Sequence, residues 1–490
     1  MNKQIKYVTI VIFLMFFSIM TSSTIIQGFQ ADNLQSDARN TRAILDSYQI
    51  QRGPILVGGV PIAESVPIDD RFRFQRVYPQ GELYAPVTGY FTHTQGRTGI
   101  EGAMNDELSG ANESFIDDIT RIVTGQQQQG AAVNLTLNAT AQQAAFDALE
   151  NYSGAAVAFV PNTGKILAMA SKPTFNPNDF AVHDNAAILE VYNRLLEDPA
   201  GPLFNRAITG NLNHPGSTFK LVTAAAALES GQYTPGSTFP NTGEFPLPQT
   251  NSAIRNSWRG LCGPGPTTTL ETGLIMSCNT QFAQIGVDMG SEAIFNQAEK
   301  FGFNQDLRIP LRVTPSKFNR VMNAPQSALS AIGQQDVIAT PLQMAMVSAS
   351  IANGGKLMKP QLVESVINPN LSVQSEFKAE ELSTALTPEI AKTLTDIMVQ
   401  TVSAPNGSAR PARIDGVNVA GKTGTAENGE DSSGNPKPYT LWFTGFAPAE
   451  NPQVAVAVVV EDGAGRGTAA TSEEIAAPIG KKIIEAVLNQ

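Results

Sequence analysis

Two short stretches of the chain repeat the same turn, and each places a serine hydroxyl at its tip. The first is HPGSTFK, from His214 to Lys220, and the second is TPGSTFP, from Thr234 to Pro240. Only the first continues into an Ala-rich segment, KLVTAAAALESG, which has high helix propensity. We therefore expect Ser217 to lie at a helix N-terminus, with Lys220 one turn further along the same face.

The spacing Ser-x-x-Lys places a base beside a nucleophile. A serine hydroxyl is a poor nucleophile until a neighbouring group takes its proton, and a desolvated lysine with a lowered pKa can take it. In the second copy Pro240 stands where Lys220 stands in the first, so Ser237 is expected to be an ordinary loop serine. Ser-x-x-Lys alone is a weak pattern, and the assignment to Ser217 depends on what else the chain carries.

Two further motifs follow Ser217 in the chain. The first is Ser277-Cys278-Asn279, and the second is KTGT, from Lys422 to Thr425, inside an expected strand. Singly, the first fits a polar helix end and the second fits a β-turn. In this order, however, Ser-x-x-Lys, Ser-x-Asn and Lys-Thr-Gly are typical of the penicillin-recognising acyltransferases, which include class A β-lactamases and penicillin-binding proteins.

The KTGT strand is expected to bind the substrate. It can lie beside an extended peptide, with Gly424 leaving room for the approach of the peptide backbone. Lys422, Thr423 and Thr425 can then hold the terminal carboxylate of the peptide by charge and hydroxyl donors. We expect the backbone N–H groups of Ser217 and Thr425 to form the oxyanion hole.

The remaining motif residues are expected to move and orient protons. Ser277 can relay a proton between Lys220 and the leaving amine, while Asn279 orients Lys220 and binds the substrate amide. With Ser217 as the nucleophile, these four residues are the expected catalytic group.

Over almost its whole length the chain resembles the class B penicillin-binding proteins, monofunctional D,D-transpeptidases without a glycosyltransferase domain. Supporting stretches are GAAVAFVPNTGKILAMASKPTFNPNDF and GQQDVIATPLQMA, and the pair RFRFQRVYP and YAPVTGYF resembles the actinobacterial penicillin-binding protein A group. The resemblance implies a serine acyl-enzyme that cross-links peptidoglycan stem peptides and is inhibited covalently by β-lactams. It also implies a polytopic membrane glycosyltransferase as partner, and no cofactor.

Three alternative functions stay open at this point. A D,D-carboxypeptidase would use the same acyl-enzyme and transfer it to water. A β-lactam sensor or a class D β-lactamase-like protein would share the Ser217-Thr218-Phe219-Lys220 form of the motif. These catalytic domains do not need a long pedestal before the serine, and a sensor would carry a large cytoplasmic output domain.

The N-terminal segment is expected to be a membrane anchor. No charged residue occurs from Tyr7 to Phe29, a stretch long enough to cross a bilayer, and Lys3 and Lys6 precede it. This charge pattern places residues 1–6 in the cytoplasm and everything after the span outside the cell membrane. A cleaved signal peptide is the alternative, although the apolar run is longer than usual for one.

Composition excludes several other classes. The chain has 33 Lys and Arg against 44 Asp and Glu, which argues against nucleic acid as a partner. It has three histidines and lacks CxxC and HExxH motifs, so no metal site is expected. The only cysteines, Cys262 and Cys278, are expected to form a disulfide outside the membrane; two buried thiols are the alternative.

The strand and helix patterns predict an α+β fold with an antiparallel sheet and helices, and the resemblance implies that this is a penicillin-binding and serine β-lactamase-like transpeptidase domain. Two apolar runs at 155–160 and 166–170 flank a Pro-Asn-Thr-Gly-Lys turn, a β-hairpin signal. Three strands follow near the C-terminus, then a helix expected to include Glu473 and Glu474 in its first turn. The expected division is a tail at 1–6, a transmembrane anchor at 7–29, a smaller β-rich, dimerisation-like pedestal at 30–148 and a transpeptidase domain at 149–490.

Overall fold

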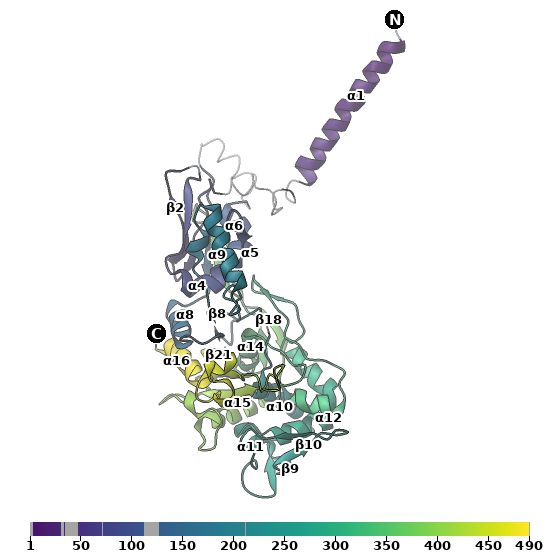
Figure 1. Cartoon of the computed structure of the whole chain (residues 1–490), viewed down its shortest axis with the longest axis vertical. Helices are drawn as coiled ribbons and strands as arrows, with labels where there is room; N and C mark the ends of the chain where they lie inside the picture. Colours follow the sequence, from purple (N-terminus) through teal and green to yellow (C-terminus); the bar gives the residue numbers. More distant parts are fainter. Residues whose placement is uncertain are drawn as a thin grey trace.

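The computed structural model describes residues 3–30, 34, 48–70, 72–111, 127–210 and 212–489. The start of the expected tail, most of residues 31–47, residues 112–126 of the expected pedestal and Gln490 lie outside the described residues. Figure 1 shows three consecutive parts: an N-terminal helix that projects away, a narrow upper part and a broader lower part that holds the C-terminus.

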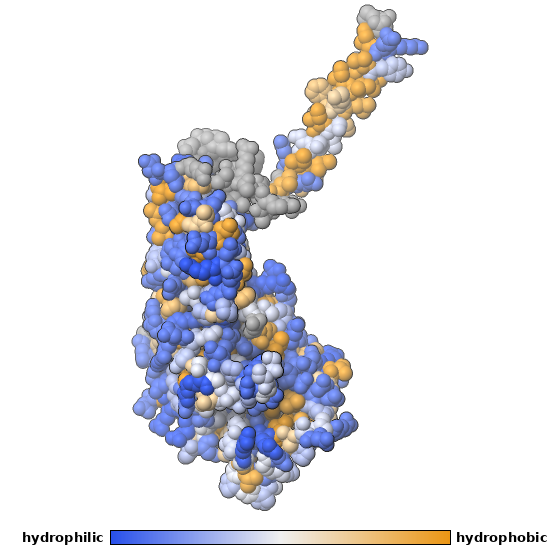
Figure 2. All heavy atoms as spheres, in the orientation of Figure 1, coloured by the Kyte–Doolittle hydropathy of each residue, from blue (hydrophilic) through white to orange (hydrophobic). Residues whose placement is uncertain are grey.

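The N-terminal helix is apolar and makes no buried contacts. Helix α1 (Lys3–Thr24) continues into the π-helical turn η1 (Ile25–Phe29). These 27 residues include an 18-residue stretch with a mean hydropathy of 2.1. At 1.5 Å per residue they reach about 40 Å, enough for a bilayer core of about 30 Å. The helix begins at Lys3, before the expected membrane span at 7–29, and its apolar side chains are visible along its length in Figure 2.

The lower part is built on a five-stranded antiparallel sheet in the order β19-β20-β21-β7-β8. Its strands are β7 (Gly154–Phe159), β8 (Ile166–Lys172), β19 (Ala420–Ala426), β20 (Thr440–Ala447) and β21 (Val454–Val460). The predicted hairpin is confirmed as the pair β7 and β8, and β21 pairs with β7 as expected for the first and last strand segments. Strand β19, which carries KTGT, lies at one edge of the sheet.

Helices cover both faces of this sheet, so the central strands are apolar on both sides. Along β21, Ala455, Ala457 and Val459 join the core that includes α14 (Pro341–Ala352). The alternate residues Val454, Val456, Val458 and Val460 pack instead with α8 (Ala139–Ala148) and α16 (Ala476–Leu488). A strand buried on both faces needs a continuous apolar run, which VAVAVVV supplies.

A mainly helical layer lies beyond α14 and contains the expected active-site helix. Its helices are α10 (Lys220–Glu229), α11 (Leu270–Ile275), α12 (Asn279–Lys300), α13 (Ala324–Ala331) and α15 (Pro388–Ser403). Residues 220–228 of α10 are all buried. The short strand pairs β9 (Thr238–Pro240) with β12 (Thr267–Thr269), and β10 (Glu244–Pro246) with β11 (Ala253–Arg255), lie at the bottom of Figure 1.

The upper part contains a second sheet, in the order β17-β16-β6-β1-β2-β3. Strands β1 (Ile55–Val57), β2 (Val60–Pro67), β3 (Phe74–Val77) and β6 (Ala132–Leu135) come from the expected pedestal. Strands β16 (Val363–Ile367) and β17 (Val373–Glu376) come from far downstream, inside the expected catalytic region. The short helices α4 (Gly81–Thr88), α5 (Gly99–Ala103) and α6 (Asn105–Ser109) complete this part.

A segment after β8 also packs onto the upper part. Phe175, Phe180 and Ile188 share a small core with Ala85 and Tyr90, and Ile188 lies on α9 (Asn185–Glu197). Asn178 bonds both the backbone N–H and the carbonyl of Tyr78, each at 2.9 Å. The two parts therefore share strands and core residues that the expected boundary near residue 148 does not anticipate.

The last helix begins later than its charges indicated. Helix α16 starts at Ala476, and Glu473 and Glu474 lie before it. Its buried face, which includes Ile479, Ile483 and Ile484, continues the core on the sheet. Packing of this apolar face, rather than the dipole preference of two acidic residues, determines where the helix begins.

Candidate active site

Ser217 lies in a tight turn directly before a buried helix. The turn is the 3-10 helix η3 (Gly216–Phe219), and α10 follows it. Its neighbours Gly216, Thr218 and Phe219 are buried, whereas Ser217 is half-buried. Ser217 therefore lies in a 3-10 turn directly before the α-helix, and it is the partly exposed hydroxyl residue of this turn.

Close backbone packing holds this turn in place. Gly216 has a φ of +52°, and a Cβ at this position would stand 2.8 Å from the carbonyl oxygen of Thr425. Its N–H donates to the carbonyl of Gly333 at 2.9 Å. On the other side, a Cβ on Gly424 would stand 2.7 Å from the Pro215 carbonyl oxygen. The space at Gly424 is therefore taken by the serine turn, not kept open for a peptide backbone.

Lys220 is fully buried and is held by the second motif. Its Nζ donates to the Ser277 carbonyl at 2.8 Å and to Asn279 Oδ1 at 2.7 Å. Burial lowers the pKa of Lys220 well below its usual range, and the charge of Lys422 adds to the shift. A neutral amine has a free lone pair, so the environment favours the form of Lys220 that can accept a proton.

The Ser277-Cys278-Asn279 segment links α11 to α12 in a strained conformation. Ser277 has a φ of +63°, which is uncommon for a residue with a side chain. Asn279 is fixed at both ends: its N–H donates to Asn256 Oδ1 at 2.7 Å and its Nδ2 to the Arg255 carbonyl at 2.8 Å. Cys278 forms a disulfide with Cys262, whose Cα lies 5.9 Å away.

Lys422 approaches Ser277 from the sheet side. Its Nζ donates to Ser277 Oγ at 2.7 Å and to the Thr423 carbonyl at 3.0 Å. Burial lowers the pKa of Lys422 to about 7, although the negative charge of Glu473 opposes the shift. Ser277 thus connects two buried lysines: its carbonyl accepts a hydrogen bond from Lys220, and its hydroxyl oxygen accepts one from Lys422.

The two threonines of the KTGT strand make different contacts from Lys422. Thr423 is buried, and its hydroxyl donates to the Ser408 carbonyl at 2.7 Å. The Thr425 hydroxyl lies 2.7 Å from Ser472 Oγ, and Ser472 Oγ also donates to the Gly424 carbonyl at 2.5 Å. Of the two, Thr425 is the one that stays partly accessible, beside a second hydroxyl.

The predicted residues therefore form a connected group, which Ser237 does not join. Hydrogen bonds link Lys220, Ser277, Asn279 and Lys422, and the close contacts at Gly216 and Gly424 bring the serine turn against the same strand. Ser237 Oγ accepts the Thr234 N–H at 2.9 Å in an exposed loop, as expected for a loop serine.

Sequence reasoning missed four residues that support this group. They are Asn256 behind Asn279, Ser408 behind Thr423, Ser472 beside Thr425 and Glu473 in the field of Lys422. No motif marks them, because each contributes one polar atom from a loop remote in the chain. Of the four, the sequence drew attention only to Glu473, which was expected in the first turn of the last helix but lies before it.

Comparison with known proteins identifies two regions of the chain. Residues 154–485 match the family model of the penicillin-binding protein transpeptidase domain, and residues 52–133 match that of the penicillin-binding protein A dimerisation domain. Neither model describes a glycosyltransferase.

Two relatives are similar over nearly their full length. The chain is 41% identical to the peptidoglycan D,D-transpeptidase PbpA of Mycolicibacterium smegmatis, with 100% of both chains covered. It is 39% identical to PbpA of Mycobacterium tuberculosis, with 100% of this chain and 99% of the relative covered. The structure of penicillin-binding protein A from M. tuberculosis as a ceftriaxone acyl-enzyme complex superposes with a TM-score of 0.86 at 39% identity, covering 91% of this chain and 100% of the other. A penicillin G acyl-enzyme complex of the same protein has a TM-score of 0.83.

The disulfide is expected to stabilise the loop that carries Asn279. Its cysteines are 16 positions apart, and closing such a loop restrains the unfolded chain by about 3 kcal/mol in the entropy model. Adding a reductant should therefore lower the unfolding midpoint of the purified protein, measured by calorimetry. A Cys262→Ala, Cys278→Ala double variant is the control, since its midpoint should not respond to reductant. Two free thiols per denatured chain in protein purified without reductant would contradict the bridge.

Proposed function

This chain belongs to the penicillin-binding protein transpeptidase family. We propose that Ser217 and the connected residues around it carry out the acyl transfer of this enzyme. The protein is a peptidoglycan D,D-transpeptidase, a serine-type enzyme that forms acyl-enzymes with β-lactams. The observation that carries the residue assignment is the pair of buried lysines joined through Ser277, one of which lies a single turn after Ser217.

In the first half-reaction, Ser217 Oγ attacks the carbonyl carbon between the two terminal D-Ala residues of a stem peptide. Neutral Lys220 accepts the hydroxyl proton, which its lowered pKa favours. The backbone N–H groups of Ser217 and Thr425 donate to the developing oxyanion. As the C–N bond breaks, the departing amine of D-Ala takes a proton from Ser277, which Lys220 or Lys422 replaces.

In the second half-reaction, an acceptor amine attacks the ester carbonyl of the acylated Ser217. The proton steps run in reverse: the attacking amine loses a proton toward Ser277, and Ser217 Oγ recovers one from Lys220. A β-lactam follows the first half-reaction, but its amine stays attached to the acyl group after the ring opens. The leaving group therefore remains in the site, where it hinders entry of the acceptor.

The substrate carboxylate is assigned to the KTGT strand. Strand β19 is a sheet edge, which an extended peptide can join. The Thr425 hydroxyl is partly accessible and lies 2.7 Å from Ser472 Oγ, whereas the hydroxyls of Thr423 and Ser472 already donate to the carbonyls of Ser408 and Gly424. The Lys422 pKa of about 7 leaves this lysine partly neutral without substrate, and a bound carboxylate favours its charged form. We therefore assign the substrate contact chiefly to Lys422 and Thr425, with Thr423 holding the strand.

We further propose that α1 anchors the enzyme with its N-terminus in the cytoplasm, beside a polytopic glycosyltransferase in the same membrane. The apolar helix α1, which is long enough to cross a membrane, and the two lysines at its start support this orientation. A transpeptidase needs polymerised glycan strands, which explains why such a partner is expected.

Protease added to intact spheroplasts should digest the catalytic part; protection until the membrane is opened would reverse the orientation. Co-purification of a polytopic glycosyltransferase with the full chain tests the proposed partner.

Ser217 is expected to be the only site of penicillin acylation. Ser217→Ala should abolish the mass increase seen by intact-protein mass spectrometry after exposure to penicillin G, because Ser217 is a partly accessible hydroxyl that lies one turn before the buried Lys220. Ser237→Ala is the matched control, since Ser237 occupies the same position in the second copy of the sequence PGSTF. This variant should be acylated like the unmodified protein. Acylation that survives the first substitution would overturn the assignment.

The two buried lysines are expected to differ in their tolerance of arginine. Lys220→Arg should slow acylation by roughly 10²–10⁴-fold, because arginine keeps its proton and cannot act as a base. Lys422→Arg keeps the positive charge that faces the substrate and should lose less. Stopped-flow acylation with a chromogenic β-lactam, on variants whose unfolding midpoints have been checked, measures both. Equal rates for the two variants would remove the base role from Lys220.

A further inference from the structure

A cavity of about 420 Å³ lies between the upper and lower parts of the molecule, lined by none of the residues assigned to the active site. One wall comes from the end of α4, from α5 and from the residues beside these helices, which include Gly89, Arg97 and Thr98. The opposite wall comes from residues 202–209 and from the hairpin of β13 (Leu307–Arg308) and β14 (Arg312–Val313). Its size lies in the range of pockets that hold small organic ligands.

Three arginines line this cavity, and their charges are poorly compensated. Arg308 and Arg312 are directly opposite each other across the β13–β14 hairpin, where like charges destabilise a pair. Arg312 has one long, exposed ion pair, to Asp306 at 3.7 Å. Among the described residues, no carboxylate lies within ion-pair distance of Arg97 or Arg308. In a chain with a net charge of −11, this local excess of cations is a specific feature.

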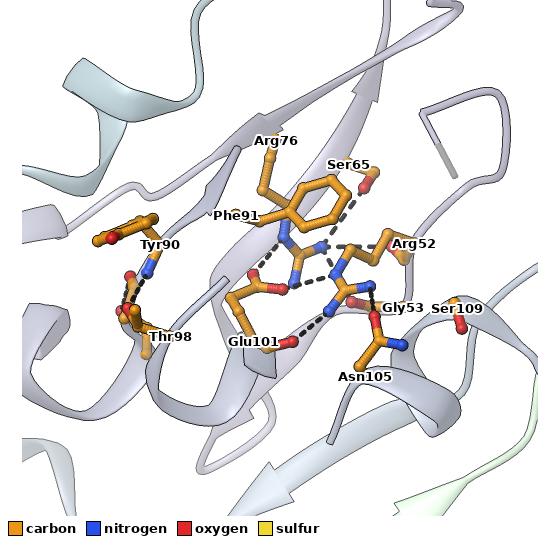
Figure 3. Close-up of polar contacts among 12 residues, drawn as sticks. Arg52, Gly53, Ser65, Arg76, Tyr90, Phe91, Thr98, Glu101, Asn105 and Ser109 are labelled. Carbon is orange, nitrogen blue, oxygen red and sulfur yellow. Dashed lines mark hydrogen bonds and ion pairs between the residues drawn. The ribbon is translucent and has the colours of Figure 1, made fainter. Parts of the chain in front are cut away.

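A buried network behind the Arg97 wall adds positive charge and fixes its geometry (Figure 3). Glu101 of α5 is fully buried between Arg52 and Arg76, and accepts a 2.6 Å bond from the Nε of each. Arg52 also donates to the Glu101 carbonyl at 2.6 Å and to Asn105 Oδ1 at 3.0 Å. Two guanidinium groups thus share one carboxylate, which leaves one net positive charge beside the cavity.

Arg97 experiences this excess charge. Burial lowers the pKa of Arg97 from its usual value and the nearby Arg52 adds to the shift, while Asp106 and Glu101 oppose it. Its half-buried guanidinium also has no hydrogen bond or ion pair within the described part of the chain. An anion in the cavity would supply the missing partner, and arginine binds carboxylates in a bidentate geometry.

Apart from Thr98, Asn205 and Thr209, the rest of the lining consists of apolar side chains and glycines. Phe175, Leu203, Phe204 and Leu311 line the cavity, and Phe204 remains 55% exposed although it is a large aromatic residue. A simple inorganic anion would use the arginines and leave Phe204 exposed. A ligand with both carboxylates and aliphatic groups would use both halves of the lining.

We propose that this cavity is a second binding site, separate from Ser217, for an acidic peptide of the peptidoglycan substrate. Its carboxylates contact Arg97, Arg308 and Arg312, and its aliphatic groups cover Phe204 and Leu311. The choice of a peptidoglycan peptide rests on the proposed function, whereas the preference for a carboxylate-bearing ligand rests on the lining. Because the walls belong to both parts of the molecule, the bound peptide bridges them.

The test uses full-length protein in detergent whose Ser217 has first been acylated with penicillin G, so that the catalytic cleft is closed to the probe. The probe is a synthetic acidic pentapeptide that ends in D-Ala-D-Ala and has free carboxylates, titrated by calorimetry. We expect saturable binding that weakens at least tenfold in Arg97→Gln and in Arg308→Gln, and that the fully amidated peptide lacks. Arg320→Gln is the matched control, because Arg320 is exposed and lies outside the cavity. Its ion pairs are long, 3.8 and 3.9 Å, and its guanidinium lies over the Phe295 ring.

The possible outcomes separate the two proposals. Failure of penicillin G to acylate the protein would overturn the assignment of Ser217, and is seen before any peptide is added. Normal acylation without peptide binding, or binding unchanged in both arginine variants, would overturn the second site. Inorganic phosphate that displaces the peptide at equal concentration would replace the peptide proposal with a simple anion site. Arg308 lies on an exposed hairpin, so its variant stays informative if Arg97→Gln lowers the unfolding midpoint.

Discussion

The side chains of Lys220 and Lys422 are both buried against Ser277. Burying two ammonium groups costs free energy, and the surrounding structure supplies the contacts that offset it. An ammonium group removed from water must find acceptors or lose its proton. Here each Nζ has two oxygen acceptors within 3.0 Å, and both pKa values are lowered. The strained backbone of Ser277 is what presents its carbonyl to one lysine and its hydroxyl to the other. Strain, burial and lowered pKa values thus belong to one arrangement.

The sheet and the helical layer meet at this arrangement through backbone contacts. Gly216, Gly333 and Gly424 lie where a Cβ would stand within 3 Å of another backbone atom. A glycine at each point lets the serine turn contact strand β19 on one side and the segment after α13 on the other. The disulfide and the side chain of Asn256 hold the Asn279 segment from a third direction. The candidate reactive groups are therefore positioned by contacts with the sheet, the helices and the disulfide.

The upper part of the molecule is tied into the catalytic part by shared strands. Strands β16 and β17 extend the pedestal sheet, and Asn178 and Asn205 each bond backbone atoms of the upper part. Such contacts couple the position of the pedestal to that of the sheet that carries KTGT. The arginine-lined cavity lies at this junction, where a ligand would contact both parts at once.

The sequence alone was sufficient to predict a candidate nucleophile with a lysine one turn away, the order of the motifs, the hairpin at β7 and β8, and the apolar N-terminal helix. Ser217 could be separated from Ser237 because the difference, a lysine and a following helix, is written within a few residues. Tertiary structure alone decided that Lys422 bonds Ser277, that Thr423 is bonded to Ser408 while Thr425 pairs with Ser472, and that Gly424 accommodates the serine turn. It also decided that strands β16 and β17 join the pedestal sheet. These features depend on contacts between residues far apart in the chain, and periodicity and propensity carry no information about which distant polar atom will meet which.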